Sequence, residues 1–190
     1  MTTHPHKYDV AISFLSKDES LAYEISDKLS PQFNVFVYSK KQEKLAGTDG
    51  LESLREVFLI ESKLVVILYR SGWGETHWTR VEQVAITDRF LKEGWDLLLF
   101  ISLDRTKDVP RWLPESKIRL SLADYGLDQC IGAIKVRAEE LGAIRKNITA
   151  VDQSKNIVEE ITFQEKRKNL LSSEKGVAGV SNPRLLLLGA

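Results

Sequence analysis

A short stretch of the chain, from Ser71 to Glu82, holds the densest group of side chains capable of chemistry. It contains two carboxylates, two tryptophans and two glycines. If a helix opens at Trp78, Glu82 lies four residues further along and faces the same side of that helix. An aromatic ring beside a carboxylate suits a ligand with a flat cationic ring. It equally suits a partly buried helix start, so the residues alone leave both interpretations open.

Strands and helices that alternate along the chain must position this cluster. Short apolar runs predict strands over residues 8–14, 33–38, 64–69, 95–103 and 118–122. Helical spacing of apolar residues predicts helices over 21–29, 51–61, 78–92 and 127–141. This alternation predicts an α/β protein with a flavodoxin-like three-layer fold, in which helices cover both faces of a five-stranded parallel sheet.

The location of a binding site follows from this topology. In open parallel sheets, ligands bind beyond the carboxyl ends of the strands. The loops over 14–18, 39–50 and 70–78 each follow a predicted strand. We therefore expect these loops to meet at one rim of the sheet and to form the site.

The length of the chain, 190 residues, allows one domain of ordinary size and a short extension. Gly142 is a suitable end for the last helix of the domain. Beyond it the pattern changes to a predicted polar helix over 150–169, Ser- and Gly-rich turns and a leucine run. We predict a domain over 1–142, followed by a helical extension or linker over 143–190 or by the start of a further domain.

Charge and composition exclude several classes of function. Lys+Arg and Asp+Glu are balanced at 27 each, so no global field attracts nucleic acid or an anionic membrane. No apolar run near the first residues indicates a signal peptide, and none approaches the roughly 20 residues of a membrane span. Cys130 is the single cysteine, which fits a reducing compartment. We expect a soluble cytoplasmic protein with no direct nucleic-acid or membrane partner.

From Tyr8 to about Leu141 the chain resembles TIR (Toll/interleukin-1 receptor) domains. Four elements in order carry the resemblance: YDVAISF followed by Ser16-Lys17-Asp18, the second strand with its loop ending Leu45-Ala46-Gly47, LVVILY followed by Ser71 and Trp73, and Trp78-Thr79-Arg80-Val81-Glu82. The last element looks like the W-x-x-x-E motif of NAD-cleaving TIR domains. The segments GTDGLESLREVF and LYRSGWGETHWTRVE look closer to bacterial TIR proteins than to animal receptor adaptors.

The resemblance implies an NAD glycohydrolase, an NAD+ nucleosidase, with Glu82 as its catalytic carboxylate. The products would be nicotinamide and either ADP-ribose or a cyclic ADP-ribose isomer. NAD would be the substrate, and neither a cofactor nor a metal is expected. The residues that the family pattern assigns to substrate binding are Phe14, Ser16, Tyr38, Asp49, Trp73 and Trp78. Tyr38 departs from the pattern, because many family members carry an acidic residue there.

The chemistry of NAD explains why one carboxylate is enough. The ribose–nicotinamide bond breaks toward an oxocarbenium-like state, as in glycoside hydrolysis. Nicotinamide is cationic in NAD and leaves as a neutral molecule, so no general acid is required. One carboxylate on the ribose side can stabilise the developing positive charge or attack the sugar. Glu75 is the competing carboxylate, and the motif spacing favours Glu82.

The resemblance also implies self-association through TIR–TIR contacts. Enzymatic family members act as assemblies, so we expect activation by self-assembly in bacterial defence signalling. The main alternative is a non-enzymatic TIR scaffold that signals by association alone. A further alternative is a module that binds a nucleotide without cleaving it.

Other kinds of site find little support in the sequence. Ser71 and His77 lack the G-x-S-x-G elbow of a serine hydrolase. His77 with a neighbouring glutamate lacks further ligands at metal-binding spacing. Neither a P-loop nor a G-x-G-x-x-G motif is present, so nucleotide binding of those types is excluded.

Overall fold

The computed structural model describes residues 6–41, 50–104, 110–114 and 118–146, and also 158, 161, 162 and 165. The chain divides into two compact units, Met1–Asn147 and Ile148–Ala190. In the second unit the four described residues are helical. The predicted boundary after residue 142 and the nature of the extension stay predictions. The elements below all belong to the first unit.

A five-stranded parallel sheet forms the centre of this unit. Its strands are β1 (Tyr8–Ser13), β2 (Val35–Phe36), β3 (Ser62–Tyr69), β4 (Leu98–Ser102) and β5 (Leu120–Ser121). Their order in the sheet is β2-β1-β3-β4-β5, and every neighbouring pair is parallel. The predicted flavodoxin-like order is confirmed.

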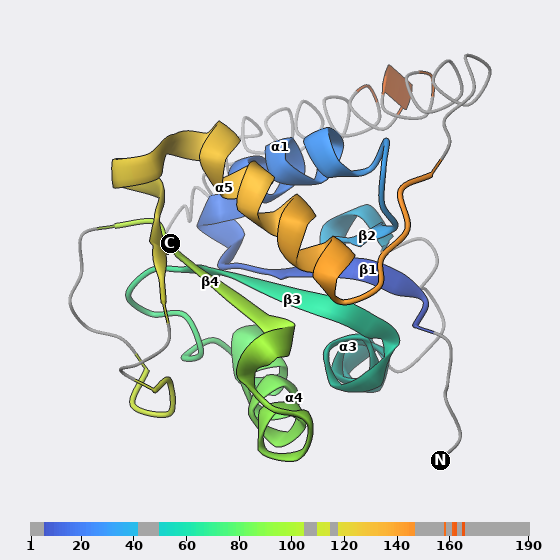
Figure 1. The fold of residues 1–190 in the computed structure, drawn as a ribbon. Coiled ribbons are helices and arrows are strands. Elements are labelled where there is room, and N and C mark those ends of the chain that lie inside the picture. The colour runs from blue at the N-terminus through green and yellow to red at the C-terminus, as the bar shows by residue number, and fades with distance from the viewer. Residues whose placement is uncertain are drawn as a thin grey trace, which may run out of the picture. The chain divides into compact units, whose positions relative to one another are not determined.

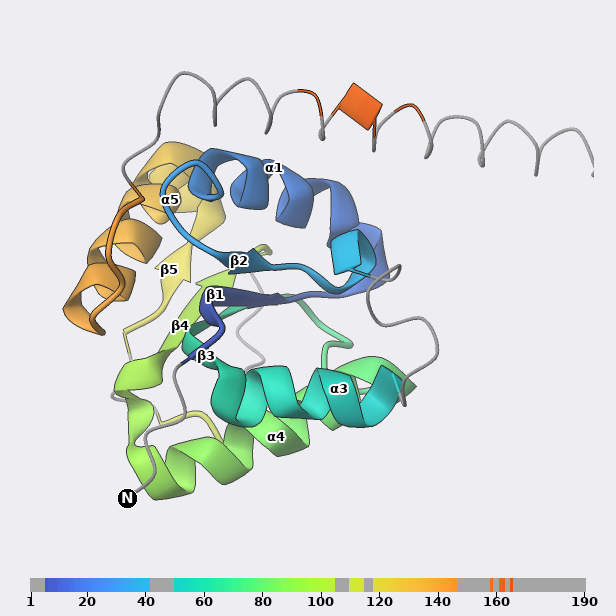
Figure 2. The same ribbon diagram turned by 90° about the vertical axis from the view of Figure 1, so that its right-hand side faces the viewer.

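Helices cover both faces of the sheet and complete the predicted three layers. Helices α1 (Glu19–Leu29) and α5 (Leu122–Glu140) lie on one face, and α3 (Gly50–Glu56) and α4 (His77–Glu93) on the other (Figures 1 and 2). A π-helical turn, η3 (Val57–Glu61), joins α3 to β3. None of the described helices is long and apolar enough to span a membrane.

A large hydrophobic core lies between the sheet and the α3/α4 layer. Strand side chains alternate between faces, so every second residue of β1 and β3 points into this core. Ala11, Val65 and Ile67 do so, and they pack with Phe58 and Ile86 from the helical layer. Strand β3 is buried almost throughout, as a strand covered on both faces should be.

The boundaries of some elements differ from the sequence-based expectation. Strand β2 has only two residues, and the 3-10 helix η2 (Tyr38–Lys41) begins where the predicted strand was to end. The run that begins at Trp95 starts as the 3-10 helix η4 (Trp95–Leu97), and β4 follows it. Helix α5 begins five residues earlier than predicted, with a kink at Gly126, whose φ is 74°.

Candidate active site

The start of helix α4 is fixed by a local network of threonines. Thr76 has extended backbone at the N-cap position, and its Oγ1 accepts the backbone N–H of Thr79 at 3.2 Å. The Thr79 hydroxyl in turn accepts the backbone N–H of Gly74 at 3.0 Å. The φ of Gly74 is 88°, a left-handed conformation that favours glycine. The helix therefore begins at His77, one residue before the predicted start, and the preceding loop is tied to its first turn.

Glu82 lies in the second turn of α4 and is buried, with 6% of its surface exposed. Its Oε2 accepts a hydrogen bond from the hydroxyl of Ser13, the last residue of β1. The Ser13 oxygen accepts the indole N–H of Trp73 at 2.9 Å. Three side chains from β1, the loop after β3 and α4 thus form one chain of hydrogen bonds at the carboxyl end of the sheet.

The surroundings of Glu82 shift its acidity strongly. Burial raises the pKa of Glu82 to about 8, and the hydrogen bond from Ser13 offsets part of that rise. Burial disfavours the charged form of a carboxyl group, whereas a donated hydrogen bond favours it. Burial therefore favours the protonated form of this carboxyl group. A carboxyl group with such a shifted pKa, at the carboxyl edge of a parallel sheet, is a candidate functional group.

Trp73 is part of the core and has little surface available for a ligand. It is 5% exposed, and its ring packs against Tyr69 and Trp112 with centroids 6.3 and 6.1 Å away. The indole nitrogen of Trp112 has no hydrogen-bond partner within the described ranges. Trp73 thus contacts the site through its indole N–H group, which donates a hydrogen bond to the Ser13 oxygen.

Trp78 and Glu82 lie four residues apart on α4, a spacing that places them on the same face of the helix, but they differ in exposure. Trp78 is 43% exposed, and its ring packs on Tyr38 with centroids 5.1 Å apart and planes inclined by 39°. Gly50, the first residue of α3, lies beside this pair, since a Cβ atom there would be 3.7 Å from the Tyr38 hydroxyl. The two aromatic residues therefore form an accessible plate at the rim, about one turn of α4 before the buried Glu82.

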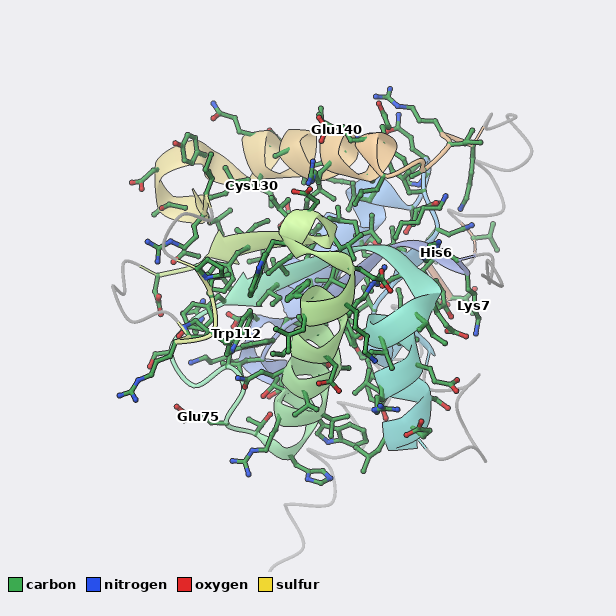
Figure 3. All side chains as sticks on the ribbon, turned by 60° about the horizontal axis from the view of Figure 1, so that its bottom comes forward. His6, Lys7, Glu75, Trp112, Cys130 and Glu140 are labelled. Atoms are coloured by element: carbon green, nitrogen blue, oxygen red, sulfur yellow. The ribbon has the colours of Figure 1, made fainter. Side chains whose placement is uncertain are left out.

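The remaining predicted residues are distributed around the same rim. Phe14 is half-buried directly after β1, and Ser16 is exposed at the start of η1 (Ser16–Asp18). Asp49 lies outside the described residues. Glu75 is exposed on the loop before α4, and Figure 3 shows it toward the same end of the molecule as Trp112, away from His6 and Lys7. Glu75 therefore lacks the burial that distinguishes Glu82.

An ion pair holds two of the rim loops together. Asp18, at the end of η1, is buried and accepts two contacts from Arg70, at 2.7 and 3.1 Å. Bidentate pairs of this kind fix geometry as well as charge. The segment Ser16-Lys17-Asp18 offers cap chemistry for α1, but Asp18 makes no side-chain cap hydrogen bond. Its carboxylate instead joins the loop after β1 to the loop after β3.

Sequence reasoning missed Ser13, the direct partner of Glu82. One signal was available, because Ser13 follows Ala11 by two residues and so faces the same side of the sheet. A serine at the end of an otherwise apolar strand, on the buried side, indicates a hydrogen-bonding partner there. Within the part of the chain that the structure describes, no group of three or more His, Cys, Asp or Glu side chains has the arrangement of a metal site.

Comparison with known proteins supports the fold. No protein-family model and no curated protein sequence matches the chain. Among solved structures, the chain is similar to a metazoan TIR-STING receptor from C. gigas, determined in complex with 2',3'-cGAMP, with a TM-score of 0.52 and 23% identity. The match covers 70% of this chain and 41% of the receptor chain. The fold is TIR-like. The predicted α/β fold with a five-stranded parallel sheet is confirmed.

Proposed function

We propose that this protein is an NAD glycohydrolase of the TIR type, with Glu82 as the catalytic carboxylate. The observation that carries the proposal is the buried carboxyl group of Glu82 at the carboxyl end of the sheet, held by the Ser13 hydroxyl. The TIR-like fold and the spacing of Trp78 and Glu82 support it. The reaction would release nicotinamide and leave ADP-ribose or a cyclic isomer.

The chemistry fits a carboxyl group of this kind. Bond cleavage develops positive charge on the ribose, and a carboxylate in a site with little water stabilises that charge far more than in bulk solvent. The pKa of Glu82, at about 8, keeps the group mainly neutral before substrate binds. The cationic nicotinamide ring would lower this pKa, because a nearby positive charge favours the ionised form. Binding of NAD would thus favour release of this proton to solvent and leave the catalytic carboxylate.

The rim residues supply candidate contacts for the rest of NAD. The accessible rings of Tyr38 and Trp78 offer a flat apolar surface for a nucleotide base or the nicotinamide ring. Phe14 and Ser16, after β1, and Asp49 remain the proposed contacts for ribose and phosphate. Trp73 is assigned to positioning, because its ring is buried.

Self-assembly is the proposed route to activation, within bacterial defence signalling. Val84 and Leu91 are exposed on α4 and lie seven residues apart, hence on one side of the helix. Exposed apolar side chains in such a row suit contact with a second copy of the chain. The same observation favours the alternative function, a TIR scaffold that acts by association without cleaving NAD.

Nicotinamide release from NAD tests the proposal. Concentrated wild-type protein should release nicotinamide, and both Glu82→Gln and Glu82→Ala should lower the rate by about a thousandfold, typical of a lost electrostatic catalyst. Glu75→Gln is the matched control, because it removes an exposed carboxylate from the same rim. It should retain nearly the full rate.

Two other outcomes would contradict parts of the proposed function. Equal release by wild type and both Glu82 variants would contradict the catalytic assignment. Absence of release by wild type, even when the protein is assembled on a surface at high density, would favour the scaffold. Separation of ADP-ribose from its cyclic isomers would identify the nucleophile that captures the ribose.

A further inference from the structure

The hydrogen bonds from Trp73 through Ser13 to Glu82 run in one direction: Trp73 donates to Ser13, and Ser13 donates to Glu82. We propose that Ser13, held in place by Trp73, is a positioning residue that orients the Glu82 carboxyl group and stabilises its ionised form for the reaction. The inference rests on the proposed function for its role in catalysis. Its structural part concerns Glu82 alone and can be tested without NAD.

The direction follows from the chemistry of the three groups. An indole N–H can only donate a hydrogen bond, so the Ser13 oxygen must be the acceptor of the 2.9 Å contact with Trp73. The Ser13 hydroxyl donates its own proton to Oε2 of Glu82. A donor at this oxygen favours the ionised carboxylate, which can only accept hydrogen bonds, and so opposes the effect of burial.

The hydroxyl of Ser13 is the main influence that opposes burial at Glu82. Burial and the Ser13 hydrogen bond are the two causes of the shifted Glu82 pKa, and no charged side chain of the described residues is a third. The ionisable groups at this end of the surrounding elements are Lys17 and Asp18 after β1, Tyr38 in η2, Tyr69 and Arg70 at the end of β3, Glu52, Arg55 and Glu56 on α3, Glu75 just before α4, and His77 and Arg80 at the start of α4. Asp18 pairs with Arg70, and Glu52 pairs with Arg55. The ionisation of Glu82 thus depends on one neutral donor.

The same contact assigns different roles to the two carboxyl oxygens. Ser13 is fully buried at the end of β1, so it cannot reach substrate itself. It occupies Oε2 of Glu82. Oε1 is therefore the oxygen that we assign to the ribose. Rotation of the carboxyl group is limited because Trp73, fixed in the aromatic core, holds Ser13 in turn.

The direct test is the titration of Glu82 itself, followed by NMR in protein whose glutamates are labelled at the carboxyl carbon. The Glu82 signal is assigned by its absence from Glu82→Gln. Ser13→Ala should raise the Glu82 pKa by about one unit, because the ionised form loses its donor. Trp73→Phe, which removes the N–H group and keeps an aromatic ring, should give a smaller rise. Ser13→Thr should restore the wild-type value.

Ser62→Ala is the matched control. Ser62 is also fully buried on the neighbouring strand, and its hydroxyl donates to the carbonyl oxygen of Val57, at the other end of the sheet. It should leave the Glu82 titration unchanged. If Ser13→Ala and Trp73→Phe both titrate like wild type, the positioning role is overturned, whether or not the protein cleaves NAD.

Turnover provides the second measurement. If NAD is cleaved, Ser13→Ala should lower kcat by about tenfold with little change in KM, because the charge of Glu82 matters most in the transition state. The pH profile of kcat/KM should move upward by the same shift as the NMR titration. A fall in kcat without movement of either titration would reduce Ser13 to a packing residue. Absence of NAD cleavage by wild type would contradict the proposed function and leave the titration test intact.

Discussion

Helix α4 carries two buried ionisable side chains, and their surroundings differ. Arg89 is 1% exposed, and its guanidinium group donates to the Glu93 carboxylate, to a backbone carbonyl and to a hydroxyl. Glu82 is 6% exposed, and its partner among the described residues is the neutral hydroxyl of Ser13. Seven residues separate the two, so they lie on the same side of the helix at opposite ends of the sheet.

This difference distinguishes a buried charge that stabilises the fold from a buried group that could take part in a reaction. A buried charge that donates to several acceptors, and which has an opposite charge beside it, is part of the fold. A buried carboxyl group held by one neutral donor costs folding free energy in its ionised form and retains affinity for a cation. By this criterion Arg89 stabilises the junction of α4 with β3, and Glu82 is the candidate for function.

The largest predicted effect concerns the pH dependence of stability at Glu82. The pKa is raised from 4.5 to about 8 in the folded protein, so between these values the folded state holds a proton that the unfolded chain releases. Stability therefore falls as pH rises across this window, by about 1.4 kcal/mol per pH unit. Glu82→Gln lacks this loss and should match wild type below the unfolded pKa, at about pH 4, and exceed it by several kcal/mol at about pH 9. Denaturant unfolding at both values measures the difference, and a pH-independent difference would contradict the buried, neutral carboxyl group.

A smaller change in stability, and one that depends little on pH, is expected when Arg89 is replaced. Arg89→Met should destabilise the fold by about 3 kcal/mol, because it leaves buried acceptors unpaired, with little dependence on pH. Arg55→Met is the control, since Arg55 makes an exposed pair with Glu52 on α3. The folded Arg89→Met protein should retain its rate of NAD cleavage. A large loss of kcat with unchanged stability would erase the contrast with Glu82.

The smallest effect is expected at the cap of α4. Thr76→Ala removes the side-chain cap and should cost about 1 kcal/mol of stability. Thr87→Ala is the control, because Thr87 sits within the same helix and its hydroxyl donates to the carbonyl of Gln83. Thermal unfolding of both variants measures the effect. Equal losses would show that the cap has no special role in holding the start of α4.

Most of the fold was predictable because hydrophobic periodicity determines which faces are buried. The run LVVILY predicts β3, and β3 forms with both faces covered. The run from Trp95 also looks like a strand, but its first residues form a 3-10 turn in which the Trp95 ring packs on Phe90. Only tertiary packing distinguishes the two outcomes. Similarly, β2 ends at Phe36, and Tyr38 begins a 3-10 helix and packs on Trp78.

The candidate site was predictable in part. Motif spacing singled out Glu82 and Trp78 as candidates, and topology predicted the edge of the sheet at which both residues lie. Helical spacing also predicted a common face, yet Trp78 is 43% exposed and Glu82 is buried. The contact with Ser13 joins residues 69 positions apart in the sequence. Such a contact depends on how α4 packs across the end of β1, which local patterns do not specify.

The most direct test of the central claim compares a pKa with the midpoint of a pH–rate profile, both measured on the same protein. One is the pKa of Glu82 from the NMR titration, and the other is the midpoint of kcat/KM for nicotinamide release, which reports groups of the free enzyme. We predict that kcat/KM rises with pH and that its midpoint coincides with the Glu82 pKa, at about 8. An NAD cleavage rate that does not follow the ionisation of Glu82, or that persists in Glu82→Gln, would contradict the account.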